Sequence, residues 1–168
     1  ALYTTATQKR KTPIPVYAEM SSINPVILLP QIKKKKTASI AAALAGSISL
    51  GVGQFCTSPG LIFALNDDAT QSFAAELATA LAAVSPATML NPQICNTYYA
   101  DKKQLARTKN IKIIFEGSEL SEVFQATPAL MQTTGVHFMA NPSLQKEILL
   151  SLEVESAIAG GALITAEI

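Results

Sequence analysis

Between an alanine-rich apolar run and the short β-like run Leu61–Leu65, the sequence reads GVGQFCTSPG over residues 51–60. Three glycines and a proline in ten residues break a helix and allow backbone conformations that other residues rarely adopt. Cys56 stands in the middle, and a cysteine thiolate is the strongest side-chain nucleophile near neutral pH. A structural cysteine usually lies inside a strand or a helix. Its place on a tight loop therefore indicates a catalytic nucleophile.

The composition sets limits on class and compartment. A chain of 168 residues can form one domain with a hydrophobic core, and 49% hydrophobic against 15% charged residues indicates surface that another domain or a subunit covers. A net charge of +1 with no basic stripe gives no case for a nucleic-acid partner. Two cysteines without a pairing pattern, and no cleavable signal, predict a reducing, cytoplasmic compartment. One histidine and two distant cysteines lack ligand spacing, so we expect no metal site.

A membrane interpretation rests on the uncharged residues 37–66, which follow the four lysines Lys33–Lys36. Against it, the run is mostly Ala, Ser, Thr and Gly and is interrupted by Gln54 and Pro59. A spanning helix needs about 20 mainly large apolar residues. We expect a buried helix and a loop, and no membrane partner. A membrane-associated hairpin, which would need detergent to stay in solution, is the alternative.

Strand-like runs alternate with helix-like runs along the chain, which predicts an α/β layer structure with a parallel sheet. The polar, basic residues 1–12 are expected to be exposed, and Asp67 or Asp68 is expected to cap the second helix. That helix should bury Phe73, Leu77 and Leu81, whereas the first should be buried nearly all round. The expected helices are 37–50, 70–84 and 92–108, with a short helix or irregular segment at 143–150. The expected strands are 14–18, 26–29, 61–65, 111–115, 129–134, 136–139 and 152–158.

Glu19 follows the expected strand 14–18 directly. Strand ends in open α/β sheets point into the ligand crevice, and a carboxylate there could activate the water that releases a covalent intermediate. Taken alone, however, Glu19 is better explained as an ordinary solvated carboxylate.

Two segments together resemble the aldehyde dehydrogenase superfamily: PVYAEMSSINPV, residues 15–26, and GQFCTSPG, residues 53–60. In that family a glutamate with a Leu-Gly-Gly-like turn lies some three dozen residues before a Gly-Gln-x-Cys loop. The residues of these two segments look most like those of the branch that oxidises α-ketoglutarate semialdehyde, also called 2,5-dioxovalerate. NPSLQKEI, residues 141–148, is similar to the segment before the family's Glu-x-Phe-Gly-Pro motif. The resemblance covers residues 13–148.

The resemblance implies a reaction and a role for four residues. Cys56 would be the nucleophile that forms a thiohemiacetal with an aldehyde, with its backbone N–H as half of an oxyanion hole. Hydride would then pass to NAD or NADP and leave a thioester, which water activated by Glu19 would hydrolyse. Glu147 would match the glutamate that binds the nicotinamide ribose. Phe55 would line the aldehyde tunnel.

The resemblance also implies a domain organisation. Residues 1–168 would be the cysteine-bearing catalytic segment of an NAD(P)-dependent enzyme that oxidises an aldehyde, and specifically a semialdehyde acid, to a carboxylic acid. Its fold would be an incomplete three-layer, parallel-sheet α/β domain of the aldehyde dehydrogenase type. The cofactor-binding domain would lie before residue 1 and an oligomerisation strand after residue 168, so that the complete protein is a homo-oligomer and the segment alone is inactive.

Two departures and one histidine keep other functions open. Ser21-Ser22 stand where the family has paired glycines, and Leu149-Leu150-Ser151 stand where it has Phe-Gly-Pro, which would fit a non-catalytic binding module. A Cys–His acyl-transfer enzyme would use His137, although a lone histidine in an apolar run is more often structural. Cys95, on an expected helix, is interpreted as a core residue.

Overall fold

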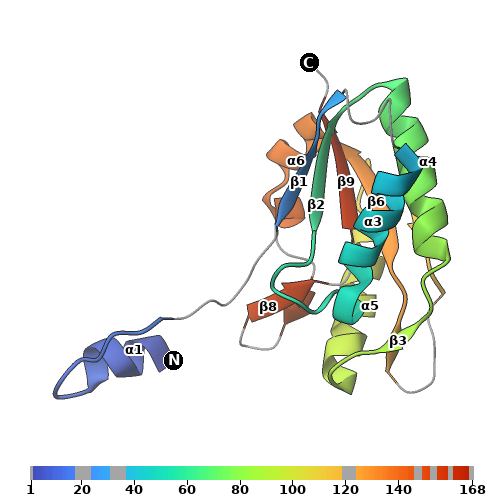
Figure 1. Ribbon diagram of the computed structural model, residues 1–168. Coiled ribbons are helices and arrows are strands. Elements are labelled where there is room, and N and C mark those ends of the chain that lie inside the picture. Colours follow the sequence, from blue (N-terminus) through green and yellow to red (C-terminus); the bar gives the residue numbers. More distant parts are fainter. Residues whose placement is uncertain are drawn as a thin grey trace.

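The structure, a computed structural model, describes residues 2–17, 24–30, 37–118, 124–145, 149–151, 155–158 and 161–166. Its centre is a five-stranded sheet in the order β1-β2-β9-β6-β4 (Figure 1). Neighbouring strands run parallel, except that the edge strand β4 is antiparallel to β6. The strands are β1 (Pro25–Leu28), β2 (Leu61–Leu65), β9 (Gly161–Ala166), β6 (Ala129–Thr134) and β4 (Lys112–Glu116).

Strand β2 shows why these apolar runs form a sheet that is covered on both faces. Successive side chains of a strand point to opposite faces. Ile62 and Ala64 are buried in the larger core cluster, whereas Leu61 and Phe63 pack in a second cluster around Phe138. A strand that is apolar on both faces therefore lies between two helical layers.

Two helices, α3 (Thr37–Ser49) and α4 (Asp68–Ala82), cover the first face. The side chain of Asp67 caps α4 by accepting a hydrogen bond of 2.7 Å from the Thr70 N–H, as the sequence predicted. The predicted inner face of α4 is also confirmed, because its three large apolar residues are almost fully buried: Phe73, Leu77 and Leu81.

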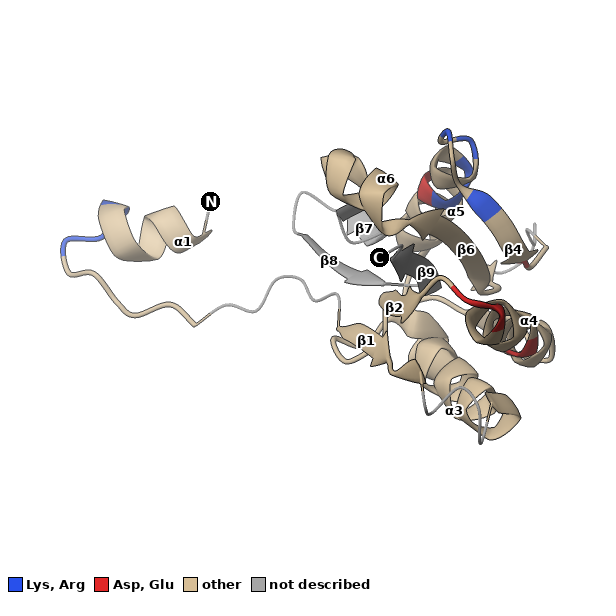
Figure 2. Ribbon diagram, turned by 90° about the horizontal axis from the view of Figure 1, so that it is seen from above, with Lys and Arg blue, Asp and Glu red and all other residues tan. Residues whose placement is uncertain are grey.

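The opposite face is covered by α6 (Gly135–Ala140) and, further along, α5 (Pro92–Ala106), as the end-on view in Figure 2 shows. Phe138 of α6 meets Phe63 of β2 edge to face, with ring centroids 5.9 Å apart. The predicted three-layer α/β fold is confirmed.

Helix α5 forms a core of its own beyond the sheet. Cys95, Tyr98 and Tyr99 pack with Met89 and Ala126 around the small antiparallel pair β3 (Ala87–Thr88) and β5 (Gln125–Ala126). Two phenols and a lysine on this helix pair with backbone carbonyls: Tyr98 with Thr127 at 2.7 Å, Tyr99 with Gln125 at 3.1 Å and Lys102 with Gly117 at 3.1 Å.

The remaining elements are short. Their bounds are α1 (Leu2–Thr4), η1 (Thr5–Lys9), η2 (Leu50–Gly53), η3 (Pro142–Gln145) and the antiparallel pair β7 (Leu149–Ser151) and β8 (Glu155–Ile158). The described part of β8 lies within the strand expected at 152–158. In the stretch expected to be a short helix or irregular, η3 is followed by the start of β7.

Three sequence predictions of local structure are wrong. Residues 14–17 form no strand, because the Ile14 N–H bonds to the Ala6 carbonyl at 3.2 Å instead of to a neighbouring strand. Residues 136–139 lie in α6, because the Thr134 side chain caps a helix by accepting from the His137 N–H at 3.2 Å. Helix α3 buries one face only, because its other face meets no layer of the described structure.

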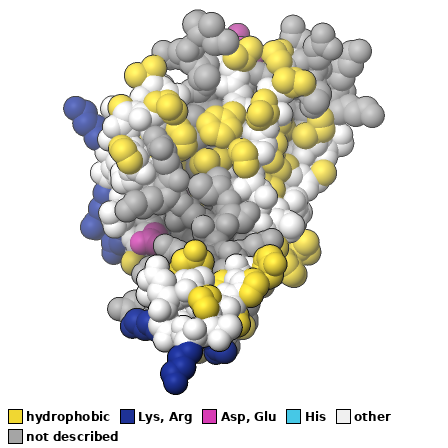
Figure 3. Space-filling view, turned by 90° about the vertical axis from the view of Figure 1, so that its left-hand side faces the viewer, with side chains coloured by type: hydrophobic (Ala, Val, Ile, Leu, Met, Phe, Trp, Pro, Cys, Tyr) yellow, Lys and Arg dark blue, Asp and Glu magenta, His cyan; other side chains and the backbone are white. Residues whose placement is uncertain are grey.

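Part of the surface is strongly apolar. Figure 3 views the β1 edge of the molecule, where hydrophobic side chains form much of the upper part and few charged ones interrupt them. Exposed apolar residues in or beside β1 include Ile27 and Leu29. The composition predicted an apolar surface, and its cover by another domain or subunit stays a prediction. Among the described helices, none combines the length and the hydropathy that crossing a bilayer demands.

Candidate active site

Cys56 is exposed on the loop that leads from η2 into β2. Because β1 and β2 are parallel, the segments that precede them meet at the same edge of the sheet, formed by the amino ends of the strands (Figure 1). The sequence had suggested a site at the carboxyl end of a strand over residues 14–18. That strand is absent from the described residues 14–17, and the loop lies at the opposite kind of edge.

The turn η2, which leads into the loop, has an unusual backbone. Gly51, Val52 and Gly53 all lie in the left-handed region, with φ of 58°, 59° and 71°. An added Cβ at Gly51 would lie 2.4 Å from Cε2 of Phe55, so the ring of Phe55 would have to move to admit a side chain. Left-handed backbone at the β-branched Val52 is an outlier, and such strain persists only where packing over-determines it. Val52 packs against the α5 cluster, which supplies that packing.

Gln54 ties the loop to the segment before α5. Its side-chain N–H donates to the Gly51 carbonyl at 3.0 Å, and its side-chain oxygen accepts from the Leu90 N–H at 2.9 Å. Both ends of one amide are therefore used, and the turn before Cys56 is held to the segment that leads into α5.

Asn24 ties the other side of the loop to β1. Its side-chain N–H₂ donates to the carbonyl of Cys56 and lies 3.4 Å from the carbonyl of Ser58. Ser58 is buried, and its N–H donates to the Phe55 carbonyl at 3.0 Å. Asn24, which stands five residues after Glu19 in the sequence, therefore contacts the predicted nucleophile.

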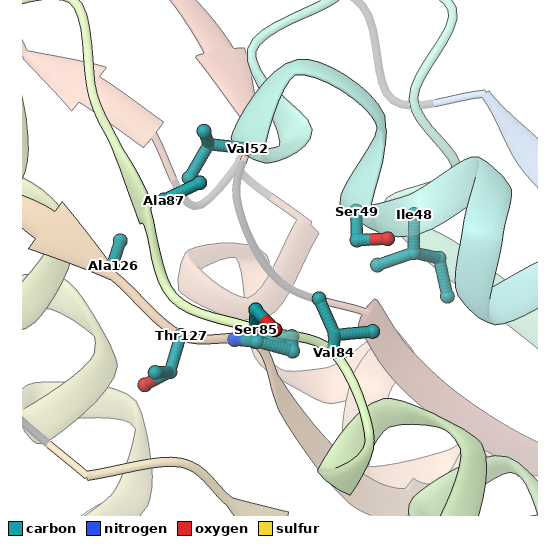
Figure 4. Close-up of a pocket in the computed structure, with 9 residues that line it drawn as sticks. Ile48, Ser49, Val52, Val84, Ser85, Ala87, Ala126 and Thr127 are labelled. Atoms are coloured by element: carbon teal, nitrogen blue, oxygen red, sulfur yellow. The ribbon is translucent and has the colours of Figure 1, made fainter.

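Phe55 stands beside the nucleophile with half of its surface exposed, and its ring lies against Gly51. A small pocket opens on the other side of η2, between the end of α3, Val52 and the strands β3 and β5 (Figure 4). Its volume of about 30 Å³ suits a group the size of a water molecule. Neither Phe55 nor Cys56 lines it, so the role of Phe55 in an aldehyde tunnel stays a prediction.

Several predicted residues lie outside the described part of the chain. These are the expected base Glu19, the expected ribose ligand Glu147, the four lysines Lys33–Lys36 and the pair Ser21-Ser22. The other departure from the family pattern, at residues 149–151, forms strand β7.

His137 lies at the far edge of the sheet from Cys56. It follows the carboxyl end of β6, whereas the Cys56 loop precedes the amino end of the co-directional strand β2. Its Nδ1 contacts the side-chain nitrogens of Asn141 at 3.1 Å and Asn110 at 3.5 Å. The histidine belongs to the packing around α6, and the Cys–His alternative loses its geometric basis.

The second cysteine has a different setting. Cys95 is buried in the α5 cluster, and its thiol donates to the Gln125 carbonyl at 3.6 Å. The interpretation as a core residue is therefore confirmed.

Burial raises the pKa of Tyr98 well above its usual value, and burial also raises the pKa of Asp101. Across the residues that the structure describes, no three His, Cys, Asp or Glu side chains gather in a group that could hold a metal ion.

No protein-family profile matches the chain. Curated relatives do match it, and two of them are described here. α-Ketoglutaric semialdehyde dehydrogenase 2 of Azospirillum brasilense is 38% identical over 139 residues, which are 83% of this chain and 26% of that protein. An α-ketoglutaric semialdehyde dehydrogenase of Acinetobacter baylyi is 34% identical over 152 residues, which are 90% of this chain and 29% of that protein.

Among solved structures, a variant of aldehyde dehydrogenase C from Pseudomonas syringae with NAD⁺ and octanal superposes with a TM-score of 0.64 at 13% identity, over 88% of this chain and 30% of that one. This chain matches a segment of an aldehyde dehydrogenase. The predicted resemblance is confirmed in sequence and in fold. The chain spans only 26–29% of the length of these two relatives.

Proposed function

We propose that residues 1–168 are the cysteine-bearing catalytic segment of an NAD(P)-dependent aldehyde dehydrogenase that oxidises a semialdehyde acid to a carboxylic acid. The observation that carries the proposal is the exposed Cys56 on a loop that Asn24 and Gln54 hold in place. The names of the two curated relatives support a semialdehyde as the substrate class. The proposal includes a cytoplasmic, homo-oligomeric complete protein.

In the proposed first step, the thiolate of Cys56 adds to the aldehyde carbon and forms a thiohemiacetal. The backbone N–H of Cys56 stabilises the negative oxygen that develops. The carbon then loses a hydride and the hydroxyl group loses a proton, which leaves a thioester on the sulfur; NAD or NADP supplies the hydride acceptor.

In the proposed second step, Glu19 removes a proton from a water molecule, which attacks the thioester carbon. The C–S bond breaks, the carboxylic acid leaves and the thiolate of Cys56 is regenerated. General-base assistance of this kind contributes about 10²–10⁴-fold to a rate. The contact of Asn24 with Cys56 supports the assignment, because Asn24 stands only five residues after Glu19 in the sequence.

The turn that follows the strand β2 does not fit the phosphates of the cofactor. The turn from β2 into α4 contains no glycine and places the carboxylates of Asp67 and Asp68 at the start of the helix, where they repel a phosphate. We propose that the phosphates bind to a separate cofactor domain and that Glu147 reaches the nicotinamide ribose. The segment alone should then show no aldehyde-dependent reduction of NAD or NADP.

The division of labour between Cys56 and Glu19 is testable in the whole protein that carries this chain. In Glu19→Gln the carboxylate is lost but the shape is kept, so thioester hydrolysis should become rate-limiting. We expect a burst of one reduced cofactor per site, followed by slow turnover, and an acyl adduct on Cys56 by mass spectrometry.

His137→Ala is the control, and its burst and steady-state rate should both match the unmodified protein because His137 lies at the other edge of the sheet. An unchanged steady-state rate in Glu19→Gln, with no trapped adduct, would remove Glu19 from the mechanism. A large loss in His137→Ala would restore the Cys–His alternative.

A further inference from the structure

Asn24 has a strained backbone at the point where the chain enters β1. Its φ of 46° lies in the left-handed region, and it precedes Pro25, the first residue of the strand. A residue before proline is normally extended, and only asparagine, aspartate and glycine accept left-handed backbone readily. Strain of this kind persists where the surrounding contacts fix it and gathers at functional sites. The side-chain contacts with the Cys56 loop contribute to fixing it here.

The amide of Asn24 fits two carbonyl groups of that loop. Its N–H₂ carries two donor hydrogens, and the carbonyls of Cys56 and Ser58 offer two acceptors. These contacts join residues 32 and 34 positions apart in the sequence. The carbonyl of Cys56 belongs to the peptide plane that follows the nucleophile, so holding it fixes the backbone of Cys56 and the direction of its Cα–Cβ bond.

We propose that Asn24 is a positioning residue, which clamps the Cys56 loop to β1 and so aims the thiol at the aldehyde carbon. The inference rests on the proposed function of Cys56. Asn24 acts through the backbone and touches no reacting atom. A displacement of about 1 Å at the reacting sulfur lowers a rate on the order of 10²-fold, so the clamp should affect kcat far more than KM.

Two variants test the clamp. Asn24→Gly keeps the left-handed backbone without strain but removes the amide. Asn24→Asp keeps the shape but replaces two donors with a carboxylate, which only accepts hydrogen bonds and repels both carbonyls.

Asn110 provides a matched control. It is also an asparagine with left-handed backbone, with φ of 63°, and it lies beside His137 at the far edge of the sheet. Asn110→Gly and Asn110→Asp therefore repeat the same two changes away from Cys56.

In the whole protein, hydrogen exchange of the peptide that covers residues 54–60 should become at least about tenfold faster in both Asn24 variants than in the Asn110 variants. kcat for aldehyde oxidation should fall about 10- to 100-fold in the Asn24 variants, with KM changed less than about threefold. The buried Cys95 should stay protected from iodoacetamide, which shows that the fold is intact. If Cys95 reacts with iodoacetamide in Asn24→Asp, the fold of that variant is disturbed, and the test of the clamp rests on Asn24→Gly.

Unchanged exchange of residues 54–60 overturns the clamp. Faster exchange with kcat within about threefold of the unmodified protein overturns the positioning role, as does an equal loss of kcat in the Asn110 variants. These outcomes differ from a failure of the proposed function, which would appear as aldehyde oxidation that survives Cys56→Ala, or as none in the unmodified protein. The hydrogen-exchange measurement tests the clamp whether or not the proposed function is correct.

Discussion

The two cysteines of this chain occupy opposite environments. Cys56 is exposed on a loop with three consecutive left-handed residues, and its carbonyl is held by a side chain from a distant part of the sequence. Cys95 is 3% exposed on a regular helix and is surrounded by two tyrosines and other apolar groups. The same residue type is thus displayed at the edge of a sheet in one case and used as a small hydrophobic group in the other.

The two environments also differ in backbone strain. Cys95 lies in the apolar packing of an amphipathic helix, and its thiol donates to the Gln125 carbonyl. Around Cys56 the backbone adopts conformations that are unfavourable at Val52 and Asn24, and the amides of Asn24 and Gln54 hold it there. A loop that served only as a connection would gain nothing from this arrangement.

The largest expected effect comes from replacing each cysteine with serine in the whole protein. Cys56→Ser should lower aldehyde oxidation by at least about 10³-fold, because a serine hydroxyl ionises far less readily than a thiol and is a much weaker nucleophile. Cys95→Ser should keep kcat within about threefold and lower the free energy of unfolding by about 1–3 kcal/mol, because a hydroxyl replaces a buried thiol. Steady-state kinetics and urea unfolding measure both. Equal losses of activity would break the distinction between the two sites.

A smaller effect is expected at two glycines, Gly51 in the strained turn before Cys56 and Gly46 within a regular helix. Gly51→Ala places a Cβ against the ring of Phe55 on left-handed backbone, so we expect a loss of about 1–3 kcal/mol of stability and a clear fall in kcat. Gly46 lies within α3 with nothing inside 4 Å of an added Cβ. Gly46→Ala should therefore raise stability by about 0.5–1 kcal/mol and leave kcat alone. A harmless Gly51→Ala would show that the loop tolerates another backbone.

The smallest expected effect is a pH dependence of stability in the Cys95 region. Burial raises the pKa of Tyr98, so the folded state holds the phenolic proton more tightly than the unfolded state, whose pKa is about 10. This contribution is fully present below about pH 10 and is lost as the pH rises beyond it, by at most about 1.4 kcal/mol per pH unit.

Urea unfolding at about pH 8 and about pH 11 should show a smaller loss of stability in Tyr98→Phe than in the unmodified protein. The variant should also be less stable at the lower pH by about 1–3 kcal/mol, because the carbonyl of Thr127 loses its partner. Equal pH slopes in the two proteins would contradict the raised pKa.

Local patterns allowed much of the fold to be predicted. Leu61–Leu65 forms strand β2 as expected, and α4 and α5 lie within two residues of the predicted helices. These segments have strong periodicity, clear caps and apolar faces that match one layer. The display of Cys56 on a loop followed from the glycines and proline around it.

What could not be predicted depends on partners distant in the sequence. The strand expected at 14–18 finds no neighbour in the described structure, and the strand-like residues 136–139 become a helix because Thr134 caps them. Strand β9 lies at the centre of the sheet, yet the last strand expected from the sequence ends at Ile158. The apolar residues between Gly161 and Ala166 were the signal that could have predicted it. No local sequence pattern predicts the hydrogen bonds that join Asn24 to the carbonyls of Cys56 and Ser58, or Gln54 to the Leu90 N–H.

The most direct test of the central claim is the labelling of both cysteines by iodoacetamide, followed residue by residue with mass spectrometry. Cys56 is exposed, whereas Cys95 can react only after its cluster opens, and each 1.4 kcal/mol or so of opening free energy slows labelling about tenfold. We expect Cys56 to react at least about 100-fold faster, and its labelling to abolish aldehyde oxidation in the whole protein. Equal rates, or full activity after Cys56 is labelled, would contradict its assignment as the displayed nucleophile.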